Sequence, residues 1–167
     1  MEKESSKAVK LPRGLRNNNP LNIRITPAQR QGKDRWLGMC KEQTDKAFCQ
    51  FTDMKWGWRA AFLLLTRNYY MVHHLYTPKD IIMRWAPPSD GNNTEAYIKF
   101  VCDKAGLQPD QYLGVPTSAE GLTWMKLALA MAIMENGVEC LDYFAMLDGW
   151  MLARDYAQRN VASTKSR

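Results

Sequence analysis

The sequence predicts an α+β fold that is mainly helical, with one small β-hairpin. Three observations lead to this prediction: apolar residues recur at helical spacing in the segments after residue 53, two short apolar runs flank the polar stretch KEQTDK, and Asn, Pro and Gly crowd the segment before them. The 167 residues suit one domain with a buried core. We expect a disordered leader at 1–12, a single domain at 13–160 and a disordered tail at 161–167.

Residues 13–35 are expected to be irregular, because turn-forming residues dominate them, with one short strand at LNIRI. The next segment, RWLGMCKEQTDKAFCQF, holds two apolar-aromatic runs around a polar centre, which is typical of a β-hairpin. Cys40 and Cys49 would lie on opposite arms. Whether these thiols form a disulfide depends on the strand register, which one sequence does not fix.

Helical segments follow, and their starts are marked by capping residues and their ends by glycine or proline. They are MKWGWRAAFLLLTRNYYMVHHL after Asp53, KDIIMRWA between Thr77-Pro78 and Pro87-Pro88, EAYIKFVCDKAG between Asn93-Thr94 and Gly106, the apolar stretch from about Ala119 to Asn136, and CLDYFAMLDGWMLARDYAQRN. A short turn of helix is expected around Pro109, Asp110 and Tyr112.

Composition excludes several classes of protein. No apolar run reaches the roughly 18 residues of a membrane span, and the N-terminus has no apolar signal segment. The net charge of +6 comes from scattered basic residues, which argues against specific nucleic-acid binding. Cys40, Cys49, Cys102 and Cys140 lack the spacing and the nearby histidines of a zinc site, so we expect free thiols and no metal or cofactor.

Glu135 is the strongest catalytic candidate because of its place in LALAMAIMENG. A helix that is apolar nearly all round is expected to be buried, so this carboxyl leaves the core at the C-terminal end of its helix. The negative end of the helix dipole and partial desolvation favour the protonated form, which can act as a general acid. The alternative is an ordinary solvated residue at a helix end.

The segment RGLRNNNPLNIR is a candidate sugar-binding loop. Its three consecutive asparagines, Asn17, Asn18 and Asn19, are flanked by arginines, among them Arg24. Asn and Arg side chains offer donors and acceptors that suit the hydroxyl and acetamido groups of sugars. The alternative is a turn-rich loop without a ligand.

Five segments over about residues 13–137 carry a family resemblance: RGLRNNNPLNIR, Trp36-Leu-Gly38, FCQF, GWRAAFLLLTRNYY and IIMRWAPPSDGNNTEAYI. Together they resemble lysozyme-like proteins encoded by phages and prophages, some of them virion structural proteins. The sequence departs from the family pattern at Leu21, where glycine is usual, and in SDGNNT near Asp90, where SEN-x-T is usual. The resemblance implies a lysozyme-like fold.

The order of the segments resembles that of bacterial glucosaminidase and lytic transglycosylase-type wall hydrolases, with one rearrangement. In those enzymes a helix that ends in a catalytic Glu precedes an Asn-rich turn, a β-hairpin and an aromatic-rich helix. Here the Glu135 helix comes last, so the chain resembles a circular permutation of that arrangement. Site chemistry depends on geometry rather than chain order, so the resemblance implies that Glu135 lies beside Asn17, Asn18 and Asn19.

The function expected from this resemblance is cleavage of peptidoglycan glycan strands, with Glu135 as the general acid that protonates the glycosidic oxygen. A hydrolase would use a second carboxylate across the groove, for which Glu42 and Asp45 are candidates. A lytic transglycosylase needs none, because the 6-hydroxyl of the sugar attacks its own anomeric carbon. Glu42 and Asp45 can equally be read as solvated residues of the hairpin turn.

Aromatic and amide side chains are candidates for the rim of a sugar-binding cleft. Trp36, Trp85 and Tyr97 could stack on sugar faces, and Trp85 is favoured because two prolines follow it closely. Aromatic residues inside helices are more often core residues, which is the alternative for all three. Asn92 belongs to a second polar loop and is a further candidate for sugar binding.

Two other functions stay open. One is a non-catalytic phage virion or structural module with the same fold, and the other is a basic nucleic-acid-binding domain, which lacks a recognition-helix or metal-finger pattern. The expected partners are peptidoglycan glycan strands and proteins of the virion or of a secretion machinery. We expect synthesis in the cytoplasm without a signal peptide, and action at the cell wall or periplasm after delivery, or within the virion.

Overall fold

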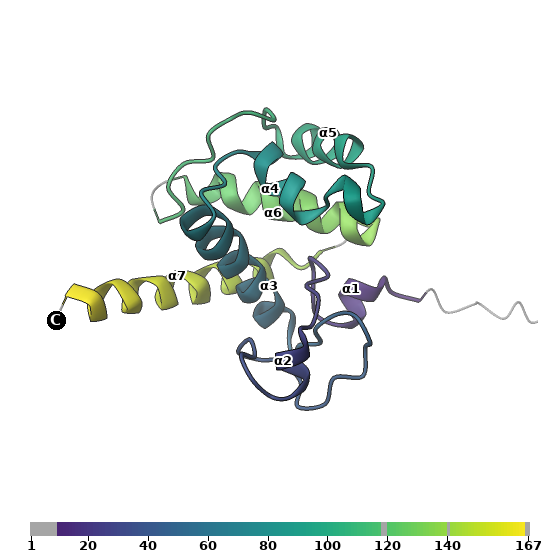
Figure 1. The fold of residues 1–167 in the computed structure, drawn as a ribbon, viewed down its shortest axis with the longest axis vertical. Helices are drawn as coiled ribbons and strands as arrows, with labels where there is room; N and C mark the ends of the chain where they lie inside the picture. The colour runs from purple at the N-terminus through teal and green to yellow at the C-terminus, as the bar shows by residue number, and fades with distance from the viewer. Residues whose placement is uncertain (1–9, 118–119, 140, 166–167) are drawn as a thin grey trace, which may run out of the picture.

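The computed structural model describes residues 10–117, 120–139 and 141–165, and helices account for most of its regular structure (Figure 1). The elements are α1 (Arg13–Arg16), α2 (Pro27–Arg30), α3 (Met54–Leu63), the π-helix η1 (Leu64–Val72), α4 (Pro78–Trp85), the 3₁₀ turn η2 (Pro88–Asp90), α5 (Thr94–Ala105), α6 (Gly121–Asn136) and α7 (Tyr143–Lys165). The mainly helical class predicted from the sequence is therefore confirmed.

The helices form an upper layer and the N-terminal segment a lower one (Figure 1). Helices α4, α5 and α6 lie together at the top, α1 and α2 lie at the bottom among irregular loops, and α3 runs between the two levels. Helix α7 packs along α3, and its far end extends to the side. The two layers meet where the C-terminal end of α6 approaches α1.

The core is built mainly from α3, α6 and α7. The apolar helix α6 is buried on most of its surface, with Leu127 and Met131 wholly inaccessible to solvent. The Phe62 ring of α3 meets the Trp150 ring of α7 edge to face, with 5.0 Å between the centroids. Leu21, where the resembled family usually has glycine, is also wholly buried. The irregular N-terminal layer therefore shares the core of the helical layer.

The capping residues expected from the sequence begin and end their helices. Three side chains accept a backbone N–H from the first turn that they cap, at Asp53, Thr77 and Asn93. Gly106 and Gly137 end α5 and α6 in the left-handed conformation. These boundaries depend on residues that are neighbours in sequence, which is why sequence reasoning could locate them. Ala119, at which the sequence predicted this last apolar helix to begin, lies outside the described residues.

The long helix expected after Asp53 changes character at Leu64. Helix α3 ends at Leu63 and continues as the π-helix η1, whose backbone bonds span one residue more than those of an α-helix. The Thr66 hydroxyl donates to the Phe62 carbonyl at 2.6 Å, in the region where the α-helical ladder is interrupted. The apolar spacing of the segment carries no signal that separates a π-helix from an α-helix.

The expected β-hairpin is not confirmed, because the described residues contain isolated bridges and no named strand. Arg24 pairs with Phe48, and Met39 with Phe51, both antiparallel. Side chains hold much of this region together, as described below. Cys40 is half-buried and Cys49 is buried, and both are free thiols. The residues around Pro109 form a turn rather than a turn of helix.

Gly57 is required where α3 passes the Asn-rich loop. A Cβ at this position would lie 1.9 Å from the Asn18 carbonyl oxygen, which belongs to the backbone and cannot rotate away. We expect Gly57→Ala to lower the free energy of unfolding by about 3 kcal/mol, the upper end of an overpacking penalty. Thermal and denaturant unfolding measure the change.

The matched comparison is Gly91→Ala. Gly91 has open space around a Cβ but a positive φ of 79°, so only the left-handed conformation resists the substitution, at about 1 kcal/mol. Equal costs at the two positions would contradict the close approach of α3 to Asn18.

Candidate active site

The Glu135 carboxyl, at the end of α6, is oriented by three hydrogen-bond donors. The Trp85 indole N–H donates to Oε1 at 2.9 Å, and the Tyr97 hydroxyl donates to the same oxygen at 3.0 Å. The Asn22 amide donates to Oε2 at 3.2 Å. The donors come from α4, from α5 and from the N-terminal layer, so the carboxyl is held by both layers.

The distribution of donors indicates which oxygen can carry a proton. Oε1 accepts two hydrogen bonds, and this uses both of its lone pairs. Oε2 accepts only the Asn22 amide and keeps one lone pair. A proton on Glu135 therefore belongs on Oε2, which leaves an O–H group able to donate to a ligand.

Tyr97 remains a donor over the whole physiological range. Burial raises the pKa of its hydroxyl, and the charge of Glu135 and the hydrogen bond to Glu135 raise the pKa further. The Trp85 indole can only donate. These two rings therefore orient the carboxyl in either of its protonation states.

Asn22 reaches Glu135 because of an unusual backbone conformation and a close fit between layers. Its φ is 52°, in the left-handed region that Asn adopts more readily than most residues. The neighbouring Asn136 amide donates to the Pro20 carbonyl at 2.9 Å and to Ala132 of its own helix. A Cβ at Gly14 would meet the Asn136 Oδ1 at 2.4 Å, so only glycine allows this contact.

A cleft of about 490 Å³ opens beside the Glu135 carboxyl. Its lining combines aromatic rings with amide and charged groups from both layers. The polar and aromatic members are Asn22, Arg24, Thr26, Gln29, Trp36, Phe48, Asn68, Tyr69, Trp85, Asp90, Asn92 and Glu135. This mixture of flat rings and amides is the chemistry by which proteins bind sugars.

Several residues predicted from the sequence meet at this cleft. Arg24, Trp85 and Asn92 line it together with Glu135. Trp36, a further aromatic candidate, also lines it. Tyr97 is buried and reaches the site through its hydroxyl, so its ring is a core residue rather than a surface for stacking.

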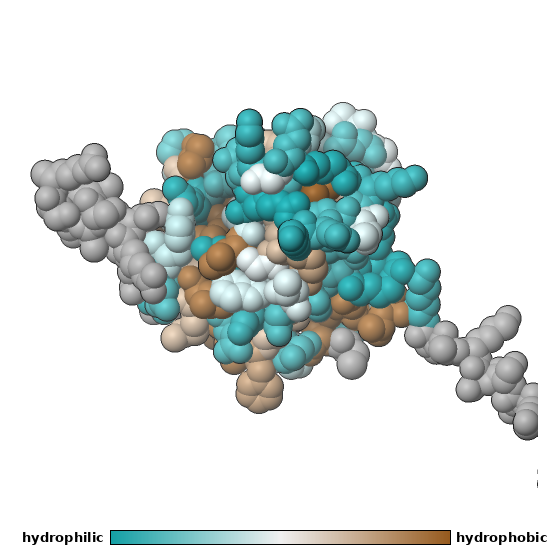
Figure 2. All heavy atoms as spheres, turned by 90° about the horizontal axis from the view of Figure 1, so that it is seen from below, coloured by the Kyte–Doolittle hydropathy of each residue, from teal (hydrophilic) through white to brown (hydrophobic). Residues whose placement is uncertain are grey.

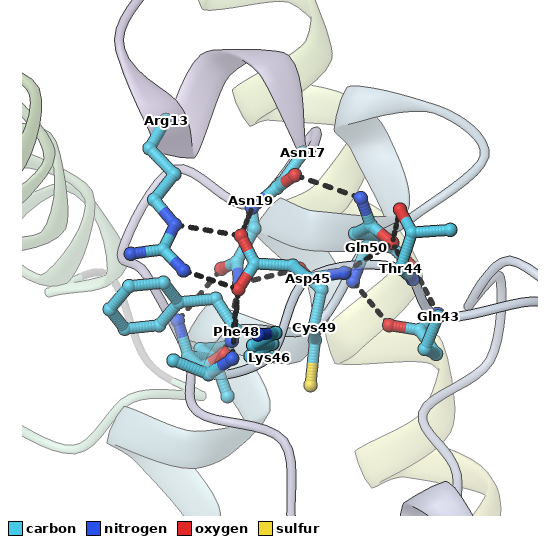
Figure 3. A network of polar contacts seen from close by, with 12 residues as sticks. Arg13, Asn17, Asn19, Gln43, Thr44, Asp45, Lys46, Phe48, Cys49 and Gln50 are labelled. Atoms are coloured by element: carbon cyan, nitrogen blue, oxygen red, sulfur yellow. Dashed lines mark hydrogen bonds and ion pairs between the residues drawn. The ribbon is translucent and has the colours of Figure 1, made fainter.

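The three asparagines of the N-terminal loop do not line the cleft, because the loop itself uses their amides (Figure 3). Asn17 donates to Asp45 and accepts from Gln50. Asn18 donates to the Phe51 carbonyl. Asn19 bonds the backbone of Ile23 and Cys49. These side chains add to the few backbone bonds of the region, such as those from the Cys49 N–H to the Ile23 carbonyl and from the Cys40 N–H to the Gln50 carbonyl.

The carboxylates expected to assist Glu135 lie outside the cleft lining. Asp45 forms an ion pair with Arg13, with 2.6 Å between Nη2 and Oδ1, and also accepts the backbone N–H groups of Ala47 and Phe48 (Figure 3). The hydrogen bond from Arg13 holds the pKa of Asp45 far below its usual range, with Asn17 and the two backbone groups adding to it. Glu42 is exposed on the same loop.

Two functional candidates escaped sequence reasoning. Asp90, in η2, is the only carboxylate besides Glu135 among the residues that line the cleft. Its position two residues after Pro87-Pro88 could have suggested it. Asn22 contacts Glu135 across 113 residues of chain, and no local pattern could reveal that contact.

The site contains no group of side chains suited to a metal. Within residues 10–117, 120–139 and 141–165, no cluster of three or more His, Cys, Asp or Glu is placed to hold an ion. None of the helices in this part of the chain has the length and apolarity of a membrane span.

Comparison with known proteins gives a phage relative. The chain is 36% identical over 141 residues to protein P5 of Pseudoalteromonas phage PM2, and the alignment covers 83% of this chain and 79% of that protein. The chain belongs to the P5 family. No family model matches the sequence. Membership of the P5 family supports the phage association that the sequence led us to expect.

The Arg13–Asp45 pair should give the fold an acid-sensitive component. Because the pKa of Asp45 is depressed in the folded chain, its stabilising contribution is complete above the unfolded pKa of about 4 and is lost as the pH falls below it. We expect Asp45→Asn to lower the thermal midpoint at pH 7, and the gap from wild type to narrow below about pH 4. Thermal unfolding of both proteins from about pH 3 to about pH 7 measures the difference between their thermal midpoints on both sides of the unfolded pKa of Asp.

Glu42→Gln is the matched control, since Glu42 is an exposed carboxylate of the same loop. It should leave the thermal midpoint unchanged at every pH. A gap for Asp45→Asn that stays constant down to acid pH would show that the ion pair does not stabilise the folded state.

Proposed function

We propose that this P5-family chain cleaves the glycan strands of peptidoglycan, with Glu135 as the general acid. The observation that carries the proposal is the oriented carboxyl in a cleft: Glu135 lines it, and three donors leave one site on Oε2 for a proton. A glycosidic bond needs such a proton, because the leaving sugar alkoxide is a poor leaving group.

The cleavage uses the proton on Oε2. As the bond between C1 and the glycosidic oxygen breaks, this proton passes to the oxygen, and Glu135 becomes a carboxylate. Three donors already point at that carboxylate, so the developing negative charge needs no rearrangement of the site. The geometry thus favours the charge distribution that follows proton transfer.

The lining of the cleft suits an N-acetylated sugar polymer. Trp36 and Trp85 are half-buried, so each can offer part of a ring to a sugar face. The amides of Asn68 and Asn92 can meet hydroxyl and acetamido groups. The resemblance to lysozyme-like phage proteins supports peptidoglycan as the polymer, and a permuted lysozyme-like arrangement remains part of this proposal.

A single oriented carboxyl favours the pathway that needs no second one. Asp90 is exposed, and no side-chain hydrogen bond fixes it within the described residues. We therefore assign the second half of the reaction to the 6-hydroxyl of the cleaved sugar. It attacks C1 and returns its proton to Glu135, so one glycosidic bond is exchanged for one intramolecular C–O bond and no water is consumed.

A glycan-binding phage module without catalysis is the second candidate, and the phage relative favours it as much as it favours an enzyme. Such a module would keep the cleft and bind the polymer. Its activity on cell walls would be absent in the wild-type chain.

Glu135→Gln should abolish cleavage and preserve the fold. Loss of general-acid catalysis costs roughly 100-fold or more in rate. The glutamine Oε1 can still accept from Trp85 and Tyr97, and the Asn22 amide can turn to present its unpartnered Oδ1 to the new amide group. Turbidity clearing of purified walls and the thermal midpoint should be measured on the same preparation.

Asp45→Asn and Glu42→Gln are the controls for this experiment, because both carboxylates lie outside the cleft lining. Each should retain clearing at a temperature where it is folded. Clearing by Glu135→Gln at the wild-type rate would reject the assigned acid, and no clearing by wild type on several wall types would favour the binding module.

The reaction products separate the two ways of completing the cleavage. We expect product ends that carry a 1,6-anhydro ring, lighter by one water than hydrolysed ends, and we expect Asp90→Asn to retain a rate within a few-fold of wild type. Mass spectrometry of the released fragments measures the first and wall clearing the second. Hydrolysed ends, together with a loss of about 100-fold in Asp90→Asn, would instead make Asp90 the base that activates water.

A further inference from the structure

A second and larger cavity, of about 1150 Å³, adjoins the Glu135 cleft. Trp36 and Asn68 line both hollows, so the two lie on either side of these residues. We name the larger hollow the arginine chamber. Its walls come from residues 34–38, from α3 and η1, and from α7. An extended ligand in the cleft can therefore continue past Trp36 into the chamber.

Two guanidinium groups of the chamber share one aromatic ring. Arg59, on α3, lies 5.3 Å from the centroid of the Tyr156 ring, and Arg67, on η1, lies 5.1 Å from it. The Arg67 Nη1 also donates to the Tyr156 hydroxyl at 2.5 Å. Two cations are thus gathered at one wall of a cavity, and a third arginine of the lining, Arg35, donates to the backbone carbonyls of Gln29, Cys40 and Lys41.

Neither arginine has a carboxylate partner in the described part of the chain. Its ion pairs are Arg13–Asp45, Lys99–Asp103 and Lys104–Glu139. Asp34 and Asp155 also line the chamber, but both are exposed and neither is paired with Arg59 or Arg67. The two guanidiniums therefore keep donors available to an anion.

The burial of Arg59 makes this arrangement costly without a ligand. Only 9% of the residue is exposed. Burial lowers the pKa of Arg59, yet a guanidinium keeps its proton at any physiological pH. A buried cation without an opposite charge is destabilising, and the Tyr156 ring compensates only in part. A carboxylate suits the vacant donors because it can accept two guanidinium N–H groups at once.

Apolar and aromatic side chains also line the chamber. Figure 2 shows the molecule from the side of α1 and α2, where the surface is mainly hydrophilic and apolar residues form separate patches. Trp36 and Trp56 both line the chamber, as does the aliphatic Leu63. The chamber therefore offers apolar and aromatic contacts beside Arg59 and Arg67, as a short peptide with acidic groups would require.

We propose that the arginine chamber binds a carboxylate carried by a side branch of the glycan strand, through Arg59 and Arg67. The proposal rests on the proposed function, because it takes the strand itself to lie in the Glu135 cleft. Peptidoglycan strands carry carboxyl groups of two kinds next to the scissile bond: those of the attached peptide and, where the peptide is absent, that of the lactyl ether. The chamber recognises the chemistry that both share.

Binding to the Glu135→Gln protein tests the proposal without cleavage of the ligand. Calorimetry should compare three ligands of equal sugar length: a peptide-bearing strand fragment, the same fragment after the peptide has been removed, and a neutral N-acetylglucosamine oligomer. We expect Arg67→Gln and Arg59→Lys to weaken binding of the peptide-bearing fragment by about tenfold or more, the scale of a lost hydrogen bond between charged groups. Both should bind the neutral oligomer as the parent does.

Arg16→Gln is the matched control, since Arg16 is exposed, lies in α1 and lines neither hollow. It removes the same charge as Arg67→Gln and should leave all three affinities unchanged. Arg59→Lys keeps the charge of the buried side chain and removes the forked pair of donors, and its thermal midpoint shows whether it is folded. Equal weakening by Arg16→Gln would reduce the effect to net charge and overturn the proposal.

The remaining outcomes separate this proposal from the proposed function. If fragments with and without the peptide bind alike and the neutral oligomer binds weakly, the chamber accepts either kind of carboxylate and the proposal stands; stronger binding of the peptide-free fragment alone would make the lactyl carboxylate the ligand. If all three ligands bind alike in every variant, the chamber binds no carboxylate, whether or not wild type clears walls. If the wild-type chain binds the carboxylate-bearing fragments selectively but clears no walls, the proposed carboxylate site stands and the proposed glycan cleavage is rejected.

Discussion

The amide of Asn136 joins the two layers of this protein, and the candidate site depends on that contact. Its Nδ2 donates to the Pro20 carbonyl of the lower layer and to Ala132 of its own helix, in a place that is almost wholly buried. The contact is possible only because Gly14 has no side chain. Glu135 precedes Asn136, so the same contact fixes the carboxyl relative to Asn22.

The two layers contribute different things to the cleft. The helical layer supplies the carboxyl and the two rings that saturate Oε1, all on helices packed into the core. The lower layer supplies Asn22, Arg24 and Trp36, on backbone that has no sheet to support it. The network around Asp45 and the three asparagines supports this backbone. The polar side chains that suggested a sugar-binding loop in the sequence therefore hold the loop in shape.

Sequence reasoning succeeded where the signal is local. Capping by Asp53, Thr77 and Asn93 involves neighbours in the chain, and the place of Glu135 at the end of an apolar helix follows from composition and the helix ending alone. It failed where the deciding contact is distant. Nothing near Asn22 indicates its bond to Glu135, and the amides of Asn17, Asn18 and Asn19 could be assigned only once their partners across the loop were known. The sequence likewise does not reveal the change from α3 to η1, because the same apolar residues occur in α- and π-helices.

The hydrogen bonds to Glu135 span 113, 50 and 38 residues of chain. Contacts of such high order form only after long loops have closed, so the carboxyl acquires its orientation late in folding. Partial opening of either layer removes at least one of the three donors, and the Glu135 carboxyl then loses its fixed orientation. A newly made or partly unfolded chain therefore contains Glu135 without its three donors, and the oriented carboxyl exists only in the complete tertiary structure.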